Sequence, residues 1–236
     1  MLEVRNIAFS YAKKTILKDV SFSVAQGERI AIVGSNGSGK TTLIKLLATL
    51  SVPDSGTISF DNQEALSRSL RYRRMVGYLP ERIALYDDMT VKAYLAYRAA
   101  LKGEAGRRIR RRMNEAAQLC QITDILRTPI SRLSNGLAKR VALADAIMLR
   151  PRILLLDDLL AGFDETMRSS IGSILDQVSA FSCVVATGHE TEDFAKWAKR
   201  ILVLKDGTIK AEIKTQDCDI TTVRNLVNAA LTGKDA

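Results

Sequence analysis

Residues 34–41 read Gly34-Ser35-Asn36-Gly37-Ser38-Gly39-Lys40-Thr41. This octapeptide comes directly after the apolar run Arg29–Val33 and leads into the helix-forming stretch Thr41–Leu50. It fits the pattern GxxxxGK[ST] between a strand and a helix, which is the context that a phosphate-binding loop requires. The alternative is an ordinary glycine turn in a strand–helix unit, which the complete motif disfavours.

Each residue type in this loop suits a phosphate chain and its magnesium ion. Glycines let the backbone turn N–H groups toward anionic oxygens, and the following helix adds the positive end of its dipole. Lys40 would place a cation on the β- and γ-phosphates, and the Thr41 hydroxyl would bind Mg²⁺. The residues predicted to bind the phosphates of a nucleotide here are Gly34, Ser35, Asn36, Gly37, Ser38, Gly39, Lys40, Thr41 and Thr42.

Two carboxylates, Asp157 and Asp158, follow the apolar run Arg152–Leu156. Unalternating runs of this kind suit parallel strands that are buried on both faces. We therefore expect Asp157 at the carboxyl end of a buried strand, where ligands bind in open α/β sheets. There it would hold Mg²⁺ opposite Thr41. An aspartate at this position could instead cap the next helix, but the loop upstream favours the metal role.

The composition disfavours several other kinds of site. The 236 residues carry 35 Lys and Arg against 26 Asp and Glu, a formal charge of +9, and 47% are hydrophobic. His189 is the only histidine, which argues against a zinc site built from several imidazoles. The three cysteines are odd in number and far apart, which favours a reducing compartment over a disulfide framework.

We expect a cytoplasmic protein. The beginning of the chain lacks the regions of a signal peptide, and no apolar run approaches the ~18–20 residues that span a bilayer. The charge allows phosphate ligands, an anionic lipid surface or nucleic acid as partners, and it does not choose among them.

The order of the patterns predicts an α/β fold with a helical insert. Lys205-Asp206-Gly207 predicts a hairpin turn near the end of the chain, and helix formers dominate from about Met89 to Met148. No repeat or linker interrupts the chain, so we expect one domain, 1–236, with a helical subdomain at about 87–148. Strand patterns occur at 2–11, 16–24, 29–33, 56–60, 75–79, 152–156, 183–187, 200–204 and 208–213.

A third motif narrows the choice among proteins with phosphate-binding loops. The segment Leu133-Ser134-Asn135-Gly136-Leu137 stands before a helix and shortly upstream of the Asp157 strand. It resembles the signature motif of ABC ATPases, whose familiar form is LSGGQ. Alone, such a segment would more often be a helix cap. Together with the other motifs, the resemblance to ABC ATPases covers about Leu2 to Ile213.

The resemblance implies the architecture and the assembly. The fold would be a P-loop NTPase core with a mostly parallel sheet, an N-terminal antiparallel β subdomain and an inserted α-helical subdomain. Two subunits would pair head to tail around two ATP molecules, each bound on one subunit and covered by the signature motif of the other. The signature residues are Leu133, Ser134, Asn135 and Gly136.

The resemblance also implies individual roles. Tyr11 falls where an aromatic residue stacks on adenine. Glu81 lies in the Q-loop and would join Thr41 and Asp157 around Mg²⁺. Asp164 lies in the D-loop. The residues implied in catalysis are Lys40, Asp158 and His189, the last as the switch histidine that contacts the γ-phosphate.

Several positions depart from the pattern of the family. Asp158 replaces the usual catalytic Glu and is shorter by one methylene, which predicts a slow ATPase. Glu81 stands where Gln is common, and Leu137 replaces the signature Gln. Leu159-Leu160 replaces Pro-Thr, and Gly188 replaces the Thr before the switch histidine. Together these changes leave open a slow or regulatory half of a heterodimer.

Two basic runs bear on the partners. One comprises Arg68, Arg71, Arg73 and Arg74, and the other lies at 107–112. They suit a solvated face or the anionic inner leaflet of a membrane. No aromatic residues interleave with the arginines, which disfavours nucleic acid.

The leading prediction is an ATP-hydrolysing subunit of an ABC transporter, peripheral on the cytoplasmic face of the membrane. It would work with a second ABC subunit, as a homodimer or heterodimer, and with a separate polytopic permease. The segment Val76–Val91 most resembles subunits of ABC-2-type exporters. The main alternative is a soluble ABC ATPase that acts on nucleic acid or ribosomes.

Overall fold

The computed structural model describes residues 1–67, 69–104 and 106–233. Arg68 of the first basic run lies outside the described residues. Within the described ranges, no helix combines the length and the apolar character needed to cross a bilayer.

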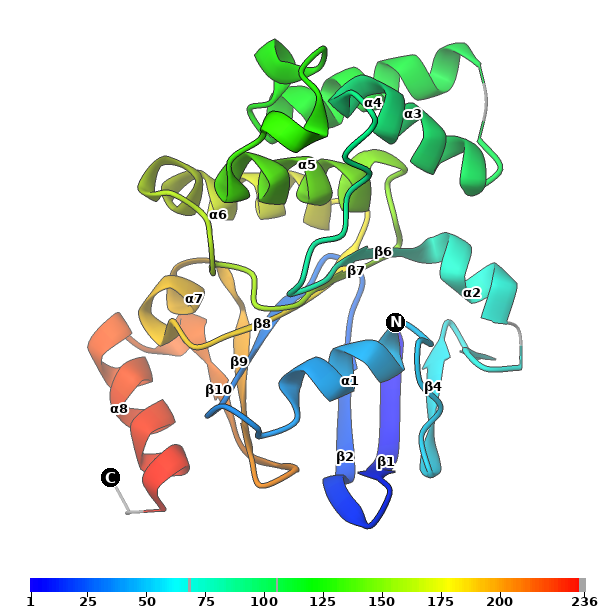
Figure 1. The fold of residues 1–236 in the computed structure, drawn as a ribbon. Coiled ribbons are helices and arrows are strands. Elements are labelled where there is room, and N and C mark those ends of the chain that lie inside the picture. Colours follow the sequence, from blue (N-terminus) through cyan, green and yellow to red (C-terminus); the bar gives the residue numbers. More distant parts are fainter. Residues whose placement is uncertain (68, 105, 234–236) are drawn as a thin grey trace.

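A six-stranded sheet carries the apolar runs of the sequence (Figure 1). Its order is β10-β9-β3-β8-β7-β6, in which β10 is antiparallel to β9 and all other neighbours are parallel. A second sheet of order β2-β1-β4-β5 is antiparallel throughout. The strands are β1 Leu2–Tyr11, β2 Lys14–Val24, β3 Arg29–Val33, β4 Ser55–Phe60, β5 Gln63–Glu64, β6 Val76–Leu79, β7 Ile153–Leu156, β8 Cys183–Gly188, β9 Arg200–Lys205 and β10 Thr208–Lys214.

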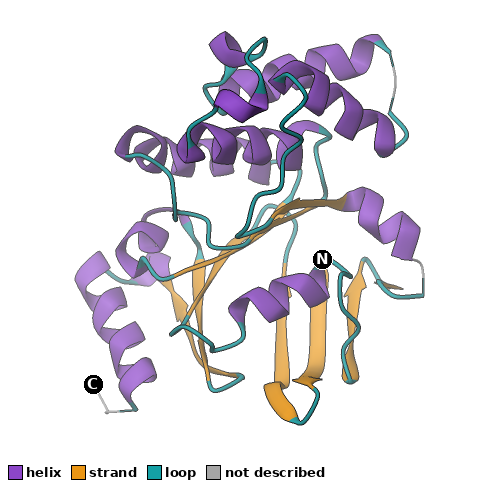
Figure 2. Cartoon of the chain, in the orientation of Figure 1, coloured by secondary structure: helices purple, strands orange, loops and turns teal. Residues whose placement is uncertain are grey.

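Three of the helices form a group of their own beside the sheets. Helices α3, α4 and α5, which come between β6 and β7 in the chain, gather at one end of the molecule, at the top of Figures 1 and 2. This arrangement confirms the predicted fold class. The helices are α1 Lys40–Leu47, α2 Ser69–Met75, α3 Val91–Leu101, α4 Arg107–Leu119, α5 Asn135–Met148, α6 Glu165–Ser179, α7 Thr191–Trp197 and α8 Ile220–Thr232.

The parallel strands are apolar on both sides because both faces of their sheet are covered. In β7, Leu154 and Leu156 belong to a core shared with α3 to α8. Ile153 and Leu155 face the opposite core, which the antiparallel sheet and α1 complete. All four side chains are fully buried, as the unalternating run predicted.

The carboxyl ends of four adjacent parallel strands lie side by side. The register pairs Val33 of β3 with Gly188 of β8, and Ala186 of β8 with Leu156 of β7. Leu156 in turn pairs with Leu79 of β6. The segments that follow β3, β8, β7 and β6 therefore leave the sheet at one edge, in this order.

The largest differences from the sequence-based expectation concern α1 and α2. The helix predicted at Thr41–Leu50 ends at Leu47, because Thr49 adopts a left-handed φ of 55°. Met75, expected in a strand, is the last residue of α2, which the pattern did not predict. Tyr72 accounts for α2, since its buried hydroxyl donates to the Leu47 carbonyl at 2.9 Å.

Gly77 and Gly172 are expected to respond in opposite ways to alanine substitution. A Cβ on Gly77 would lie 2.8 Å from Pro151 Cγ and would also meet the Ala146 carbonyl, so Gly77→Ala should destabilise the chain by about 1–3 kcal/mol. A Cβ on Gly172 in α6 would make an ordinary contact, 3.6 Å from Trp197 Cβ. Gly172→Ala should therefore stabilise by about 0.4–1 kcal/mol. Urea unfolding measures the free energy of unfolding of both variants. Equal values for Gly77→Ala and Gly172→Ala would contradict the crowding at Gly77.

Candidate functional site

A pocket of about 390 Å³ opens at the carboxyl edge of the parallel strands. Its walls come from the glycine loop, the start of α1, strand β2 and the segments that follow β6, β7 and β8. The structure thus brings together motifs that lie more than a hundred residues apart in the chain. The lining residues are Lys14, Ile16, Asn36, Gly37, Gly39, Lys40, Thr41, Thr42, Glu81, Asp157, Asp158, Thr187 and His189.

The glycine loop has the backbone geometry that an anion site needs. Gly37 and Gly39 adopt φ values of 79° and 108°, which side chains disfavour. A Cβ on Gly39 would also lie 2.7 Å from Leu17 Cδ2. Gly39 precedes α1 and makes no side-chain cap bond. The first N–H groups of the helix are therefore left to an anionic ligand.

Lys40 points into the loop. Its Nζ donates to the carbonyls of Gly34 at 2.7 Å and Ser35 at 3.1 Å, and it lies 3.4 Å from His189 Nε2. Burial lowers the pKa of Lys40, while nearby carboxylates, Asp158 first among them, oppose this shift. The ammonium group is thus held where loop and acidic residues meet.

Asp157 is the most buried acid of the site, with 1% of its surface exposed. Its Oδ1 accepts from the hydroxyls of Thr41 at 3.1 Å and Thr187 at 2.8 Å. Its Oδ2 has no hydrogen-bond partner among the described residues. Burial raises the pKa of Asp157, and the two hydroxyl bonds oppose this.

The oxygen atoms around Thr41 fit a magnesium ion. Mg²⁺ takes hard oxygen ligands from one or two carboxylates together with phosphates and water. The unpartnered Oδ2 of Asp157 is such an oxygen, and Glu81 Oε2 lies 3.4 Å from the Thr41 hydroxyl. The described residues hold no cluster of three or more His, Cys, Asp and Glu that could hold a metal alone, so substrate phosphates would have to complete the set.

A second pocket, of about 680 Å³, adjoins the first through Glu81 and Asp158. The signature segment reaches it from the start of α5. Ser134 caps this helix, because its Oγ accepts from the Leu137 N–H at 3.3 Å. The hydroxyl proton of Ser134 remains free to donate to another acceptor. Further lining residues are Leu133, Asn135, Ala138, Lys139, Ala161 and Gly162.

Asp164 has two partners within its own chain. It caps α6 by accepting from the Met167 N–H at 2.8 Å, and both of its oxygens accept from Arg140 Nη2 at 2.7 Å. The Met167 bond, followed by the Arg140 contact, lowers the pKa of Asp164. Asp164 is therefore tied to α5.

The residue before the histidine is glycine for a packing reason. A Cβ on Gly188 would lie 2.6 Å from Cζ of Phe194, a fully buried ring. The threonine of the related motif would not fit here without displacing that ring. His189 itself donates its backbone N–H to Glu190 Oε2 at 3.0 Å.

Tyr11 stands apart from the other predicted site residues. It ends β1, is 49% exposed, and packs edge-on against Phe9 with ring centroids 4.8 Å apart. Tyr11 is not among the residues that line the two pockets, whereas Lys14 and Ile16 of β2 line the first. Its stacking on adenine stays a prediction.

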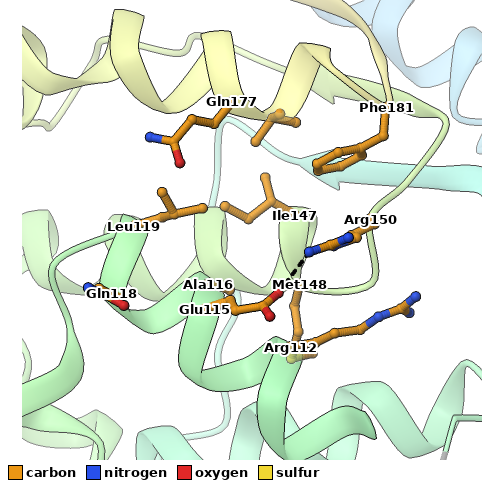
Figure 3. A pocket seen from close by; sticks show the side chains of 11 residues that line it. Arg112, Glu115, Ala116, Gln118, Leu119, Ile147, Met148, Arg150, Gln177 and Phe181 are labelled. Carbon is orange, nitrogen blue, oxygen red and sulfur yellow. Dashed lines mark hydrogen bonds and ion pairs between the residues drawn. The ribbon is translucent and has the colours of Figure 1, made fainter.

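A third pocket, of about 510 Å³, contains none of the predicted catalytic or nucleotide-binding residues (Figure 3). It lies between α4, α5 and α6, and two of its lining residues, Arg150 and Glu115, form an ion pair at 3.0 Å. Arg112 of the second basic run lines it and donates to the Leu149 carbonyl at 3.3 Å.

The remaining arginines of the basic runs divide into structural and exposed ones. Arg73 donates to the hydroxyl and the carbonyl of Thr49, at 2.8 and 2.9 Å. Arg111 pairs with Glu115 at 3.4 Å. The other exposed arginines are Arg71, Arg74, Arg107, Arg108 and Arg110.

Sequence reasoning gave no role to two residues that hold the site together. Thr187 bonds to Asp157 and to the backbone of Asp158, and Lys139 bonds to the carbonyl of Asp158. A signal for Lys139 was available. The stretch Val141–Met148 that follows it is apolar apart from Asp145, and a charged residue in a helix without a polar face needs buried partners.

A strand, a glycine loop of the form GxxxxGK[ST], a helix, and a strand-end aspartate at the same sheet edge define a P-loop nucleoside triphosphatase. The sequence profile of the ABC transporter family matches residues 17–161, and the chain belongs to this family.

Among curated proteins, the chain is similar to the sulfate/thiosulfate import ATP-binding protein CysA of Bradyrhizobium diazoefficiens. The identity is 36% over 219 residues, which cover 89% of this chain and 62% of that protein. The chain thus spans about three-fifths of the length of this relative. It is also 29% identical to the ABC transporter ATP-binding protein YxlF of Bacillus subtilis, over 92% of this chain and 72% of that protein.

Solved structures share the fold. An ATP-binding subunit of an ABC transporter superposes with a TM-score of 0.88 at 24% identity, over 97% of this chain and 99% of that chain. A dimeric bacterial ABC transporter cassette gives 0.84 at 25% identity, over 91% of this chain and 99% of that chain. A bacterial Atm1-family ABC exporter with ATP bound gives 0.84 at 27% identity, over 100% of this chain and 42% of that chain.

Asp157→Asn is expected to unfold at a higher temperature than the parent at pH 7, without nucleotide and with a chelator present. Burial raises the pKa of Asp157 above its ordinary value of 3.8, so ionisation costs the folded state free energy that the unfolded state does not lose. The advantage of the variant should shrink as the pH falls toward 4. Thermal unfolding across this range measures it, each kcal/mol being worth about 2–4 °C. A parent that is as stable as the variant at pH 7 would contradict the burial cost.

Proposed function

We propose that this chain is the ATP-binding and ATP-hydrolysing subunit of an ABC transporter. In this proposal it pairs head to tail with a second ABC subunit and energises a separate membrane permease. The observation that carries the proposal is the meeting of Lys40, Asp157 and His189 with the glycine loop in one pocket. Residues 1–236 would form one domain, with 87–148 as its helical subdomain.

In the proposed cis site, the loop and α1 bind the phosphates of ATP. The N–H groups of the loop residues 34–39 and of Lys40, Thr41 and Thr42 face the β- and γ-phosphates, and Lys40 exchanges its carbonyl acceptors for phosphate oxygens. Thr41, Asp157 and Glu81 would hold Mg²⁺, which neutralises phosphate charge when bound. Tyr11 stacks on adenine.

Hydrolysis transfers the γ-phosphoryl group to water. Asp158 polarises and orients the water, and His189 contacts the γ-phosphate and completes the charge stabilisation with Lys40. The scaffold contributes mainly position and charge, because these groups sit on segments that follow adjacent strands. Asp164 communicates between the two subunits.

In the proposed dimer, the signature segment serves the ATP of the opposite subunit. Leu133, Ser134, Asn135 and Gly136 lie at the N-terminus of α5, where a helix presents N–H groups and a positive dipole end to an anion. The free hydroxyl proton of Ser134 would reach the γ-phosphate in trans. ATP therefore joins the subunits, and hydrolysis releases them.

A groove of about 320 Å³ suits the permease. Leu50, which is 59% exposed, lines it together with Ile83 and Leu85 from the segment after the Q-loop. Arg98 of α3 and Lys102, the residue that follows α3, also line it. Apolar side chains with a basic rim would grip a short cytoplasmic helix of the permease.

For the direction of transport we propose export, on the resemblance of Val76–Val91 to ABC-2-type exporter subunits. The CysA relative carries import in its name. The subunit would lie on the cytoplasmic face of the membrane, where the exposed arginines face anionic lipid. Co-purification from solubilised membranes tests the assembly. A polytopic membrane protein supports the proposal, whereas ribosomal proteins or DNA contradict it.

Asp158→Asn is expected to form a dimer in the presence of ATP and Mg²⁺, because it binds ATP but lacks the carboxylate that polarises water. Size-exclusion chromatography with light scattering measures the dimer. Lys40→Met added to Asp158→Asn is the control and should remain monomeric, since it loses the cation on the phosphates. A monomer in both cases would refute pairing around ATP.

Asp158→Glu is expected to accelerate single-turnover hydrolysis. The Asp158 carboxylate ends about one methylene, ~1.5 Å, short of the usual position, and ~1 Å of misplacement at a reacting centre can cost on the order of 100-fold in rate. The exposed Asp124→Glu in the helical insert is the matched control and should leave the rate unchanged. A rate for Asp158→Glu equal to that of the parent would show that distance does not limit the reaction.

A further inference from the structure

Lys139 is a buried cation whose ammonium group contacts the backbone of the segment Asp158–Ala161, which follows β7. It lies on α5, one turn after the signature residues, and is 4% exposed. Its Nζ donates to the carbonyl of Asp158 at 2.6 Å and to the carbonyl of Ala161. It also lies 5.1 Å from the centroid of the Phe163 ring. Three parts of the segment after β7 therefore converge on one ammonium group.

A neutral side chain would avoid the cost of burying this charge. Removing an ammonium group from water is unfavourable unless it is paired and hydrogen-bonded. Burial lowers the pKa of Lys139. The negative charges of Asp158, Glu190 and Asp157 oppose this shift, and the positive charge of Arg168 adds to it. The two carbonyls and the aromatic face offset part of the cost. Packing alone does not require a lysine at this position.

The residue that Lys139 holds has an unusual backbone. Asp158 adopts a φ of 50°, in the left-handed region that non-glycine residues rarely occupy. Such a conformation persists where the surroundings over-determine it, and it clusters at functional sites. Here the Asp158 N–H donates to Thr187 Oγ1 at 2.9 Å and the next N–H, of Leu159, donates to the Thr187 carbonyl at 2.9 Å. Lys139 fixes the remaining polar group, the Asp158 carbonyl.

We propose that Lys139 is a positioning residue that sets the place of the Asp158 carboxylate and couples it to the signature helix. The proposal rests on the function proposed above, in which the N-terminus of α5 contacts the ATP of the opposite subunit. Ser134, the N-cap of α5, and Lys139 are five residues apart, about 7.5 Å along the helix axis. A shift of α5 as it engages one ATP is thereby passed through Lys139 to the carboxylate that acts on the other.

A positioning role for Lys139 should affect the rate of ATP hydrolysis but not the affinity for ATP. Lys139 does not line the phosphate pocket, whose lining comprises Lys40, Thr41 and their neighbours. Loss of its ammonium group should therefore leave ATP affinity unchanged and misplace Asp158. Since ~1 Å of misplacement costs on the order of 100-fold, we expect a loss of at least tenfold in the hydrolysis rate constant.

The test compares Lys139→Met, which keeps the length of the side chain without its charge, with Lys139→Arg, which keeps the donors. Lys92→Met, on an exposed lysine of α3, is the control. Single-turnover hydrolysis at saturating ATP and Mg²⁺ should fall at least tenfold in the Met variant and stay within about threefold of the parent in the Arg and Lys92 variants. The Kd for ATP should stay within about twofold in all of them.

A second readout distinguishes positioning from damage to the signature helix. Lys139→Met in the Asp158→Asn background should dimerise with ATP as well as Asp158→Asn alone. A parent-like rate in Lys139→Met overturns the proposal, as does a loss of dimerisation that matches the loss of rate. A parent that hydrolyses no ATP instead refutes the proposed function. If the Met variant does not fold, as judged by circular dichroism, Lys139→Leu provides the same comparison.

Discussion

The parallel register of β3, β8, β7 and β6 is the constraint on which the rest of the structure depends. Val33 pairs with Gly188, and Leu156 pairs with Leu79 and with Ala186, two residues before Gly188. The segments after these strands must therefore share one edge. This register brings the glycine loop, His189 and the two aspartates to one edge. Contacts then form among them, such as Lys40 Nζ to His189 Nε2 and Thr41 Oγ1 to Asp157 Oδ1. The register persists because both faces of these strands are buried, so a slip of one residue would exchange the two apolar cores.

The site concentrates charges that a protein interior normally avoids. Lys40, Lys139 and Asp157 are each withdrawn from water, and each has at least one polar partner in the chain. Two buried side-chain oxygens of the site, Asp157 Oδ2 and Ser38 Oγ of the glycine loop, have no partner among the described residues. An uncompensated oxygen of this kind costs stability and is what a divalent cation with its phosphates would satisfy. The unpartnered carboxylate oxygen thus lowers the stability of the ligand-free chain, and binding of a cation with its phosphates would raise it again.

Packing explains two of the departures from the family pattern. Gly188 leaves space for the buried ring of Phe194. Leu159 and Leu160, which replace Pro-Thr, are fully buried, and a non-proline residue after Asp158 lets that aspartate adopt its left-handed φ. Asp tolerates a left-handed φ better than most residues. The backbone conformation at position 158 therefore suits the aspartate that replaces the usual glutamate. The substitution of Leu137 for the signature Gln has no such account in the structure.

The sequence by itself determined nine strands, the glycine loop and the strand-end carboxylates, because hydrophobic runs and local motifs act within a few residues of one another. It did not predict the two-residue strand β5. It also gave the order of β and α segments that defines the fold class. Only the tertiary structure decided that Lys139 holds Asp158, that Arg140 ties Asp164 to α5, and that Tyr11 lies outside the lining of both pockets. These pairings join residues 19 and 24 positions apart across separate elements. Their geometry depends on how the buried helix α5 packs beside β7, which no local pattern specifies.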